Sequence, residues 1–443
     1  MENQNEKSLD CRGVLVGVED GNTTHAQVEA ELSELSRLLD TAGGETVARV
    51  IQNKATPDPR TWIGSGKVAE IAELCANNDV DLVVFDTELS PSQIRNLEDG
   101  ISSKGEVRVI DRSMLILDIF ALHATTGEGK LQVELAQLRY TAPRLIGKGT
   151  QMSRLGGGIG TRGPGESQLE SDRRHIQRRI RALEEELETL DKNRRTMRAS
   201  RDRSGLPKIA IVGYTNAGKS TVLNRLTDAG ILAEDKLFAT LDPTTRKFAL
   251  PCGESVLLTD TVGLIRKLPH HLINAFRSTL DEAVYADMLM IVIDASDPEC
   301  REQLEVTRQL LEELGAGDKP TLYVFNKCDR GISEVLDMGR APEREDAVWI
   351  SAATGQGVEQ MVERLERMLH EGKRLVKFLI PNARQGLLNT LYSQASVKTV
   401  EYGAEAVTVE AVVDTKVLGM LAEYAEGYTK PKEDWEDDDF DGE

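Results

Sequence analysis

Residues 11–110 alternate between two patterns of hydrophobic positions. Short runs rich in β-branched residues have the length of buried strands, and the segments between them carry apolar residues three and four positions apart, as helices facing a core do. Ser65 and Ser90 are expected to cap two of these helices. The alternation predicts a small α/β domain with a mostly parallel sheet. The predicted strands are 13–17, 46–51, 81–85 and 107–110, and the predicted helices are 24–41, 65–77 and one beginning at 91.

A helical region follows, with predicted helices over 111–120 and 129–145. Residues 156–165 contain six glycines, so this segment is expected to be a mobile loop. Residues 166–198 have neither glycine nor proline and repeat apolar residues at spacings of three, four and seven, which predicts an amphipathic or coiled-coil helix. That helix would extend about 50 Å at 1.5 Å per residue, and 129–145 is its expected antiparallel partner.

A glycine-containing loop stands between a predicted strand at 208–212 and the start of a helix at 221. Glycine lets backbone N–H groups point inward around phosphates, and the helix N-terminus adds positive potential. Lys219 is expected to reach the β- and γ-phosphates, and the Ser220 hydroxyl is expected to bind Mg²⁺. The loop fits G-x-x-x-x-G-K-[ST], the pattern of a phosphate-binding loop, with Gly213, Tyr214, Thr215, Asn216, Ala217, Gly218, Lys219 and Ser220.

Two further segments have the composition of nucleotide-dependent switches. The first consists of Phe238, Ala239, Thr240, Leu241 and Asp242. A switch needs a hydroxyl that binds Mg²⁺ only when the γ-phosphate is present; Thr240 is the candidate, and Thr244 and Thr245 are open alternatives. The second follows a predicted strand at 255–259 and consists of Asp260, Thr261, Val262 and Gly263. Asp260 would hold Mg²⁺ through water, and the Gly263 amide would sense the γ-phosphate.

Leu264 stands where Ras-like enzymes have a glutamine that orients the attacking water. Leucine neither donates nor accepts a hydrogen bond, so we expect slow intrinsic hydrolysis, completed either by a partner surface or by another residue of the chain. Asn216 is a candidate ligand for K⁺ bridging the phosphates, and hydrogen bonding within its own loop is the equal alternative. The candidate catalytic residues are Lys219, Thr240, Asp260 and Gly263.

Two segments after later predicted strands suit a guanine base. Asp329 can accept hydrogen bonds from guanine N1–H and the 2-amino group, which adenine lacks, so a buried unpaired carboxylate would disfavour adenine. Lys327 would pack its stem over the base, and a backbone amide of 351–353 would meet guanine O6. Ligands bind beyond the carboxyl ends of parallel strands, so these motifs predict an open, mostly parallel sheet around GTP. The two segments are Asn326, Lys327, Cys328 and Asp329, and Ser351, Ala352 and Ala353.

The rest of the chain completes a multidomain α/β protein. Strands at 375–380, 397–402 and 406–413, with helices at 383–395 and 415–424, predict a compact βαββα module. The predicted organisation is an N-terminal α/β domain at 1–125, a helical hairpin with a Gly-rich basic loop at 126–203, a P-loop GTPase domain at 204–372, a small C-terminal α/β domain at 373–428 and an acidic disordered tail at 429–443.

Charge is distributed unevenly along the 443 residues. The net charge of −20 argues against nonspecific nucleic-acid binding by the whole surface. Residues 139–203 nevertheless hold 16 Lys/Arg against 9 Asp/Glu, and 433–443 hold 8 acidic residues. The acidic tail at 433–443 is expected to act as a solubilising end of the chain. The basic excess fits either a solvated helix face or a footprint on RNA phosphates, without base stacking. Its arginines include Arg162, Arg173, Arg174, Arg178, Arg179, Arg181, Arg194, Arg195 and Arg198.

Several classes of protein are disfavoured by composition. No run approaches the ~18 apolar residues of a membrane helix, and the N-terminus lacks the features of a signal peptide. We therefore expect a cytoplasmic protein without integral membrane association. The five cysteines are scattered and form no C-x-x-C pair, so neither zinc nor a disulfide framework is indicated.

Together these motifs resemble the HflX family of ribosome-associated GTPases, within the Obg–HflX-like class of P-loop GTPases. The most diagnostic stretch is GGGIGTRGPGESQLESDRR at 156–174, and the resemblance spans residues 10–425. Ser167 and Ser171 stand where the family usually has Thr. The other matching stretches are GYTNAGKS at 213–220, FATLDPTTR at 238–246, DTVGLIRKLPHHL at 260–272 and NKCD at 326–329.

The resemblance implies binding to the large ribosomal subunit near the peptidyl-transferase region, ribosome-stimulated GTP hydrolysis and dissociation of stalled ribosomes under stress. It also assigns the Mg²⁺ hydroxyls to Ser220 and Thr240 and supports a hydrophobic residue at Leu264. Without the resemblance, the residues alone predict only a GTP-dependent switch with a basic arm. Open alternatives are an RNA- or ribosome-assembly-binding factor and a regulatory GTPase acting on a protein partner. The expected partners are GTP or GDP and ribosomal RNA, without DNA, and the free protein is expected to be a monomer.

Overall fold

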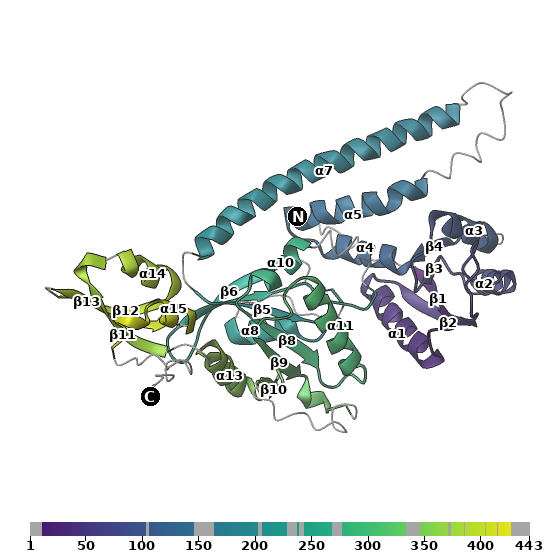
Figure 1. Cartoon of the computed structure of the whole chain (residues 1–443). Helices are drawn as coiled ribbons and strands as arrows, with labels where there is room; N and C mark the ends of the chain where they lie inside the picture. The colour runs from purple at the N-terminus through teal and green to yellow at the C-terminus, as the bar shows by residue number, and fades with distance from the viewer. Residues whose placement is uncertain are drawn as a thin grey trace, which may run out of the picture. The chain divides into compact units, whose positions relative to one another are not determined.

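A computed structural model gives the arrangement of the chain (Figure 1). The chain forms two compact units: the first comprises 1–194, 208–248 and 257–358, and the second comprises 195–207, 249–256 and 359–443. The predicted disordered tail at 429–443 lies outside the described residues. The structure describes 11–102, 106–145, 164–202, 206–227, 237–238, 243–267, 277–333, 346–370, 374–384, 386–403, 405–413 and 415–426.

The N-terminal part of the first unit is built on a parallel sheet. Its strand order is β2-β1-β3-β4, and every pair is parallel. Alternate side chains enter two separate cores because successive residues of a strand face opposite sides: Leu15 packs with α1, and Val16 packs with α2 and α3. The predicted α/β domain is confirmed in its elements. Its strands are β1 (Arg12–Glu19), β2 (Glu45–Asn53), β3 (Leu82–Phe85) and β4 (Arg108–Asp111).

Helix caps in this domain match the sequence prediction at one helix and differ at another. Ser90 caps α3 through a capping box with Gln93, as expected. The predicted cap at Ser65 is wrong, because Gly64 is the extended N-cap residue and Ser65 is already helical, with no side-chain cap bond. The helices are α1 (His25–Thr41), α2 (Ser65–Asn77), α3 (Pro91–Ile101) and α4 (Arg112–His123).

Two long helices, α5 (Gly127–Leu145) and α7 (Pro164–Asp202), form the predicted antiparallel pair (Figure 1). Arg179 binds Glu134 through two nitrogens, each at 2.7 Å, and Arg139 binds Glu184 at 2.6 Å. Helix α7 starts earlier than predicted, at Pro164, since proline fits the first turn, where backbone N–H groups need no intrahelical partner. Residues 156–163 of the expected mobile loop, which include Arg162, lie outside the described residues.

A six-stranded sheet follows in the order β10-β9-β8-β5-β7-β6. The pairs of β5 with β7 and β8, and of β9 with β8 and β10, are parallel, which confirms a mostly parallel P-loop fold. Its strands are β5 (Lys208–Gly213), β6 (Thr244–Ala249), β7 (Ser255–Asp260), β8 (Met288–Asp294), β9 (Thr321–Asn326) and β10 (Ala347–Trp349). Its helices are α8 (Lys219–Thr227), α10 (Arg277–Tyr285), α11 (Cys300–Glu313) and the short η3 (Cys328–Arg330). Helix α13 (Val358–His370) belongs, apart from its first residue, to the second unit.

The second unit contains the predicted βαββα module. Its antiparallel sheet has the order β11-β13-β12, and Phe378, Leu391 and Val409 are among the residues buried in its core. The last predicted helix is interrupted after Met420. The elements are β11 (Arg374–Pro381), η4 (Asn382–Arg384), α14 (Gly386–Gln394), β12 (Ser396–Tyr402), β13 (Ala406–Val413), α15 (Thr415–Met420) and η5 (Ala422–Tyr424). Within the described ranges, no helix has the length and apolar character needed to cross a membrane.

Candidate functional site

The phosphate-binding loop connects β5 to α8. Gly213 has φ +151° and Gly218 has φ +96°, and both positions are too crowded for a side chain. A Cβ on Gly213 would lie 2.2 Å from the Val292 carbonyl oxygen, and one on Gly218 would lie 2.3 Å from Nδ2 of Asn326. The loop therefore needs glycine both for its backbone conformation and for its close approach to neighbouring strands.

Lys219 is buried at the start of α8, and its Nζ donates to the Tyr214 carbonyl at 2.9 Å. Burial lowers its pKa to about 8, nearby Lys327 acts in the same direction, and the Asp260 carboxylate opposes the change. A buried ammonium is unfavourable without an anionic partner. The Lys219 position thus favours binding of a multiply charged phosphate.

Ser220 and Asp260 supply oxygen atoms suited to Mg²⁺. The Ser220 hydroxyl donates to Oδ2 of Asp260 at 2.7 Å, whereas Oδ1 of this fully buried carboxylate has no hydrogen-bond partner. Desolvation raises the pKa of Asp260, which a nearby cation would offset. Hydroxyl and carboxylate oxygens are the ligands that Mg²⁺ prefers, so this pair fits the ion. When bound, Mg²⁺ neutralises charge on the β- and γ-phosphates.

The segment after β7 lies directly on the phosphate loop. Leu264 donates its N–H to the Gly213 carbonyl at 3.1 Å and accepts from the Thr215 N–H at 2.8 Å. Gly263 is so close that a Cβ there would lie 2.7 Å from Cγ2 of Thr215 and 3.2 Å from Nζ of Lys219. The Gly263 backbone thus lies beside the amine expected to bind the γ-phosphate. Leu264 itself is 2% exposed and belongs to a hydrophobic cluster.

The first predicted switch segment is described only in part. Phe238 is buried, with its ring 4.7 Å from that of Phe120 in a T-shaped contact. Thr245, one alternative to Thr240, shares a hydrogen bond with Thr259 across 2.9 Å. Thr244 begins β6. The choice among these hydroxyls stays a prediction, because four predicted residues lie outside the described part of the chain: Ala239, Thr240, Leu241 and Asp242.

Asn326 joins the phosphate loop to the segment after β10. Its Nδ2 donates to the Ala217 carbonyl at 2.9 Å, and its Oδ1 accepts from the Ala352 N–H at 3.0 Å. Both atoms of the buried side-chain amide are therefore satisfied by loop backbone. This places three predicted motifs at one edge of the sheet, where the carboxyl ends of β5, β9 and β10 meet.

The predicted base-binding residues also come together at this edge. The pKa of Asp329 is lowered, chiefly by a hydrogen bond from the Ser351 side chain, so its exposed carboxylate is an anionic acceptor at neutral pH. Lys327 adopts a left-handed conformation, with φ +65°, and pairs with Asp294 at 2.8 Å. Ala352 is buried and Ala353 is exposed. Asp329 therefore offers the acceptor that guanine requires, whereas the Ser351 and Ala352 N–H groups already donate to the Gln356 carbonyl and to Oδ1 of Asn326.

Two important carboxylates were not identified from the sequence. Asp294 could have been noticed as a polar residue at the end of the central buried strand β8. Glu34 gives no such signal, since it stands one position before Leu35 in an ordinary amphipathic helix. Its burial depends on elements more than 70 residues away in the sequence, including Arg112.

The second unit brings together three side chains that could ligate a metal. The ligand atoms of Cys252, Glu254 and His370 lie within 4.8 Å of one another. Glu254 is already paired with Lys398 at 2.8 Å and with Nε2 of His370 at 3.2 Å. The ion pair with Lys398 and the hydrogen bond with His370 account for the position of Glu254 without a metal.

Comparison with protein families matches three consecutive regions of the chain. Residues 29–121 match the family described as GTP-binding GTPase N-terminal, and 123–201 match GTP-binding GTPase Middle Region. Residues 208–327 match the family described as 50S ribosome-binding GTPase. The three matches correspond to the α/β domain, the helical pair and the site-bearing sheet.

The chain is also similar to individual proteins over most of its length. It is 47% identical over 424 residues to GTPase HflX of Lacrimispora saccharolytica, covering 96% of this chain and 98% of that protein. It is 43% identical over 390 residues to GTPase HflX of Escherichia coli, covering 88% and 90%. A crystal structure of SsGBP with GDP aligns at 26% identity and a TM-score of 0.46, over 81% of this chain and 99% of that one. The chain therefore belongs to the HflX family of GTPases, enzymes that hydrolyse GTP.

Proposed function

We propose that this GTPase binds the large ribosomal subunit and uses GTP binding and ribosome-stimulated hydrolysis to dissociate or recycle stalled ribosomes. The match of residues 208–327 to a family described as 50S ribosome-binding GTPase carries the proposal. The basic arm supports it, because ribosomal RNA presents a dense array of phosphates.

The arm formed by α5 and α7 presents several exposed arginines. Arg179 is held by Glu134, so its charge is partly neutralised within the helical pair. Arg173, Arg174, Arg178 and Arg181 are exposed as well. Exposed guanidinium groups on a long helix can pair with successive phosphates. In this proposal Arg179 fixes the arm, and the exposed arginines contact RNA.

The nucleotide site is proposed to bind GTP with Mg²⁺ in the arrangement expected from the motifs. Ser220 and Thr240 would ligate the ion, Asp260 would hold it through water, and Lys219 and the Gly263 amide would contact the γ-phosphate. K⁺ at Asn216 is part of the same proposal. The five-segment domain division with boundaries at 125, 203, 372 and 428, and a cytoplasmic location, are likewise proposed.

Sedimentation with purified ribosomes tests partner and switch together. The protein should co-sediment with the large subunit in a non-hydrolysable GTP analogue, dissociate in GDP, and hydrolyse GTP faster when the subunit is present. Unchanged hydrolysis with ribosomal subunits would contradict the proposal. Cellular function that survives Lys219→Ala would instead favour a binding factor in which hydrolysis is incidental.

Salt dependence then distinguishes RNA binding from a protein partner. Replacing Arg173 and Arg174 by Gln should reduce the slope of log affinity against log salt by about one for each phosphate that is no longer bound. The matched control is Arg179→Gln, which should alter the slope less because Glu134 already pairs with this arginine. A shallow slope, unaffected by the double substitution, would indicate a protein partner.

A further inference from the structure

A turn and a helix end in the second unit bring together three different kinds of metal-ligating side chain. Cys252 and Glu254 lie between the last residue of β6 and the first of β7, and His370 is the last residue of α13. All three belong to the same compact unit. Because a thiol, a carboxylate and an imidazole meet here, this cluster differs from an ordinary group of surface acids.

The turn between β6 and β7 is closed by its own backbone. The Gly253 N–H donates to the Leu250 carbonyl at 2.9 Å, and the Leu250 N–H donates to the Glu254 carbonyl at 2.7 Å. Gly253 has φ +87°, a conformation that glycine adopts without strain. Cys252 is exposed and Glu254 is half-buried. The turn therefore presents both side chains from a fixed backbone and leaves the thiol free to rotate.

His370 is held in one tautomer by its own helix. Its Nδ1 donates to the Glu366 carbonyl at 2.8 Å, since a carbonyl oxygen only accepts. In the neutral ring the lone pair is then on Nε2, which lies 3.2 Å from Oε2 of Glu254. Two acceptors at this distance need a positive species between them, either a second ring proton or a metal ion. A ring N–H bonded to a backbone carbonyl is the usual support of a metal-ligating histidine.

Glu254 is oriented by Lys398 of β12. The Lys398 Nζ donates to Oε1 of Glu254 at 2.8 Å, whereas Oε2 is the oxygen that lies next to His370. A carboxylate that binds a metal through one oxygen commonly has its own partner on the other. The ion pair with Lys398 therefore fixes the carboxylate and leaves Oε2 directed at the imidazole.

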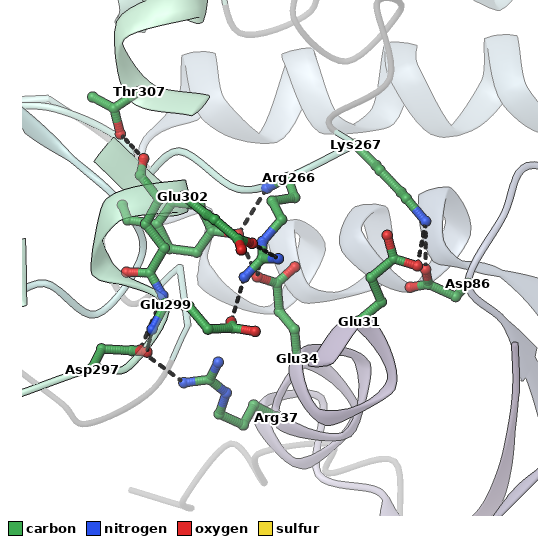
Figure 2. A network of polar contacts seen from close by, with 12 residues as sticks. Glu31, Glu34, Arg37, Asp86, Arg266, Lys267, Asp297, Glu299, Glu302 and Thr307 are labelled. Carbon is green, nitrogen blue, oxygen red and sulfur yellow. Dashed lines mark hydrogen bonds and ion pairs between the residues drawn. The ribbon is translucent and has the colours of Figure 1, made fainter. Parts of the chain in front are cut away.

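A carboxylate-rich network in the first unit shows the contrast. There the Lys267 Nζ binds Glu31 at 2.7 Å and Asp86 at 3.0 Å, so the ammonium group itself lies between the two carboxylates (Figure 2). Such a network is neutralised by side chains of the chain. At Cys252 a thiol and an imidazole, which are ligands of softer metal ions, take the place of the ammonium group.

We propose that Cys252, Glu254 and His370 form a Zn²⁺ site with water as the fourth ligand. Sulfur, imidazole nitrogen and carboxylate oxygen are the atoms that bind Zn²⁺ in proteins, and three protein ligands leave one position for water. With Zn–N of about 2.0 Å and Zn–S of about 2.3 Å, tetrahedral ligand atoms lie about 3.5 Å apart. The ligand atoms here are within 4.8 Å of one another, so a small rotation of the exposed thiol completes the site. The thiol binds as a thiolate and releases its proton to solvent.

A bound ion would cross-link two distant segments of the chain. Glu254 and His370 are 116 residues apart, which is why the absence of a C-x-x-C pair gives no information on this site. The cross-link would hold the turn at 249–256 to the end of α13 and make local opening of both segments rarer. This role is separate from GTP hydrolysis and from the ribosomal function proposed above.

Metal titration of the full chain tests the site. The protein is stripped with a chelator and then saturated with GDP and Mg²⁺, so that the nucleotide site does not compete. One equivalent of Co²⁺ should produce a thiolate-to-metal charge-transfer band, and Zn²⁺ should displace the Co²⁺. Cys252→Ser should abolish the band, and His370→Asn should weaken Zn²⁺ binding by at least about 10-fold, the loss found even for an outer partner of a ligand. Zn²⁺ should also slow hydrogen exchange in peptides 249–256 and 359–370, except in Cys252→Ser.

Two matched variants keep the test decisive. The Nδ1 of His123 is bonded in the same way to the Ile119 carbonyl, at 2.9 Å, but His123 belongs to no metal-ligand group in the part of the chain that the structure describes. His123→Asn and Cys11→Ser should therefore preserve the band and the affinity. The proposal is overturned if Co²⁺ gives no thiolate band, if the band survives Cys252→Ser, or if His370→Asn and His123→Asn bind Zn²⁺ equally. In each of those cases Nε2 of His370 carries a second proton toward Glu254 instead of a metal.

Discussion

Ser220 donates its hydroxyl proton to Oδ2 of Asp260 at 2.7 Å, while the second oxygen of that buried carboxylate has no partner. This relationship joins the phosphate loop to the segment after β7. It leaves one buried acceptor for which a metal-bound water is the expected partner.

Asp260→Asn should weaken Mg²⁺ binding in the nucleotide complex by about 10–100-fold, because the carboxylate orients metal-bound water. Titrating Mg²⁺ into the protein with a GTP analogue measures this. Asp287→Asn is the matched control: Asp287 accepts the Lys208 N–H at 2.8 Å at the opposite end of β5. Equal Mg²⁺ dependence in the two variants would show that Asp260 is not part of the metal site.

Asp329→Asn should reduce GDP affinity by about 10–100-fold, the loss expected when hydrogen bonds to a charged group are removed. Affinity for xanthosine diphosphate should rise, since an asparagine amide can donate to the oxygen that replaces the guanine 2-amino group. Competition binding with both nucleotides provides the measurement, with Arg330→Gln as control. If the base preference does not change, the base does not bind at Asp329.

Nucleotide binding should weaken as pH rises above 8. In the free protein, burial lowers the pKa of Lys219 to about 8, whereas a bound phosphate favours the charged amine. Above pH 8 binding must therefore take up a proton, and log affinity should fall by up to about one per pH unit. Calorimetry at pH 9 in buffers of different ionisation enthalpy measures the uptake.

The same calorimetric experiment at pH 7 is the control, since Lys219 is then already protonated before binding. Proton uptake that occurs at pH 9 and is absent at pH 7 would agree with a lowered pKa of the buried Lys219 amine. Equal heats in all buffers at pH 9 would contradict its depressed pKa.

Leu264→Gln should not restore a water-positioning residue. Its side chain lies in the hydrophobic cluster with Tyr214 and Ile265, so glutamine would bury an amide there at a cost of about 1–3 kcal/mol in the free energy of unfolding. Intrinsic phosphate release should stay as slow as in the unchanged protein. Leu264→Met, which conserves volume, should cost less than about 1.5 kcal/mol. Faster hydrolysis in the Leu264→Gln variant would mean that the segment carrying residue 264 readily turns this side chain out of the hydrophobic cluster.

The order of strands, glycine loop and helices could be predicted because each depends on short-range patterns. The run at 208–212 became β5, and Gly213 and Gly218 occupy conformations that favour glycine. The cap at Ser65 failed because the choice between adjacent Gly64 and Ser65 depends on backbone angles, which residue type does not determine.

Residue types at fixed spacing were enough to predict the GTPase fold, because its motifs require particular chemistry in a particular order. The assignment of groups to phosphate, Mg²⁺ and guanine rests on the same spacing and stays a prediction. Two relationships emerged only from the folded chain: Asn326 joins two loops, and Glu34 meets Tyr214. Glu34 and Tyr214 are 180 residues apart. They meet because one domain packs against another, and no local pattern of hydrophobic and polar residues specifies that packing.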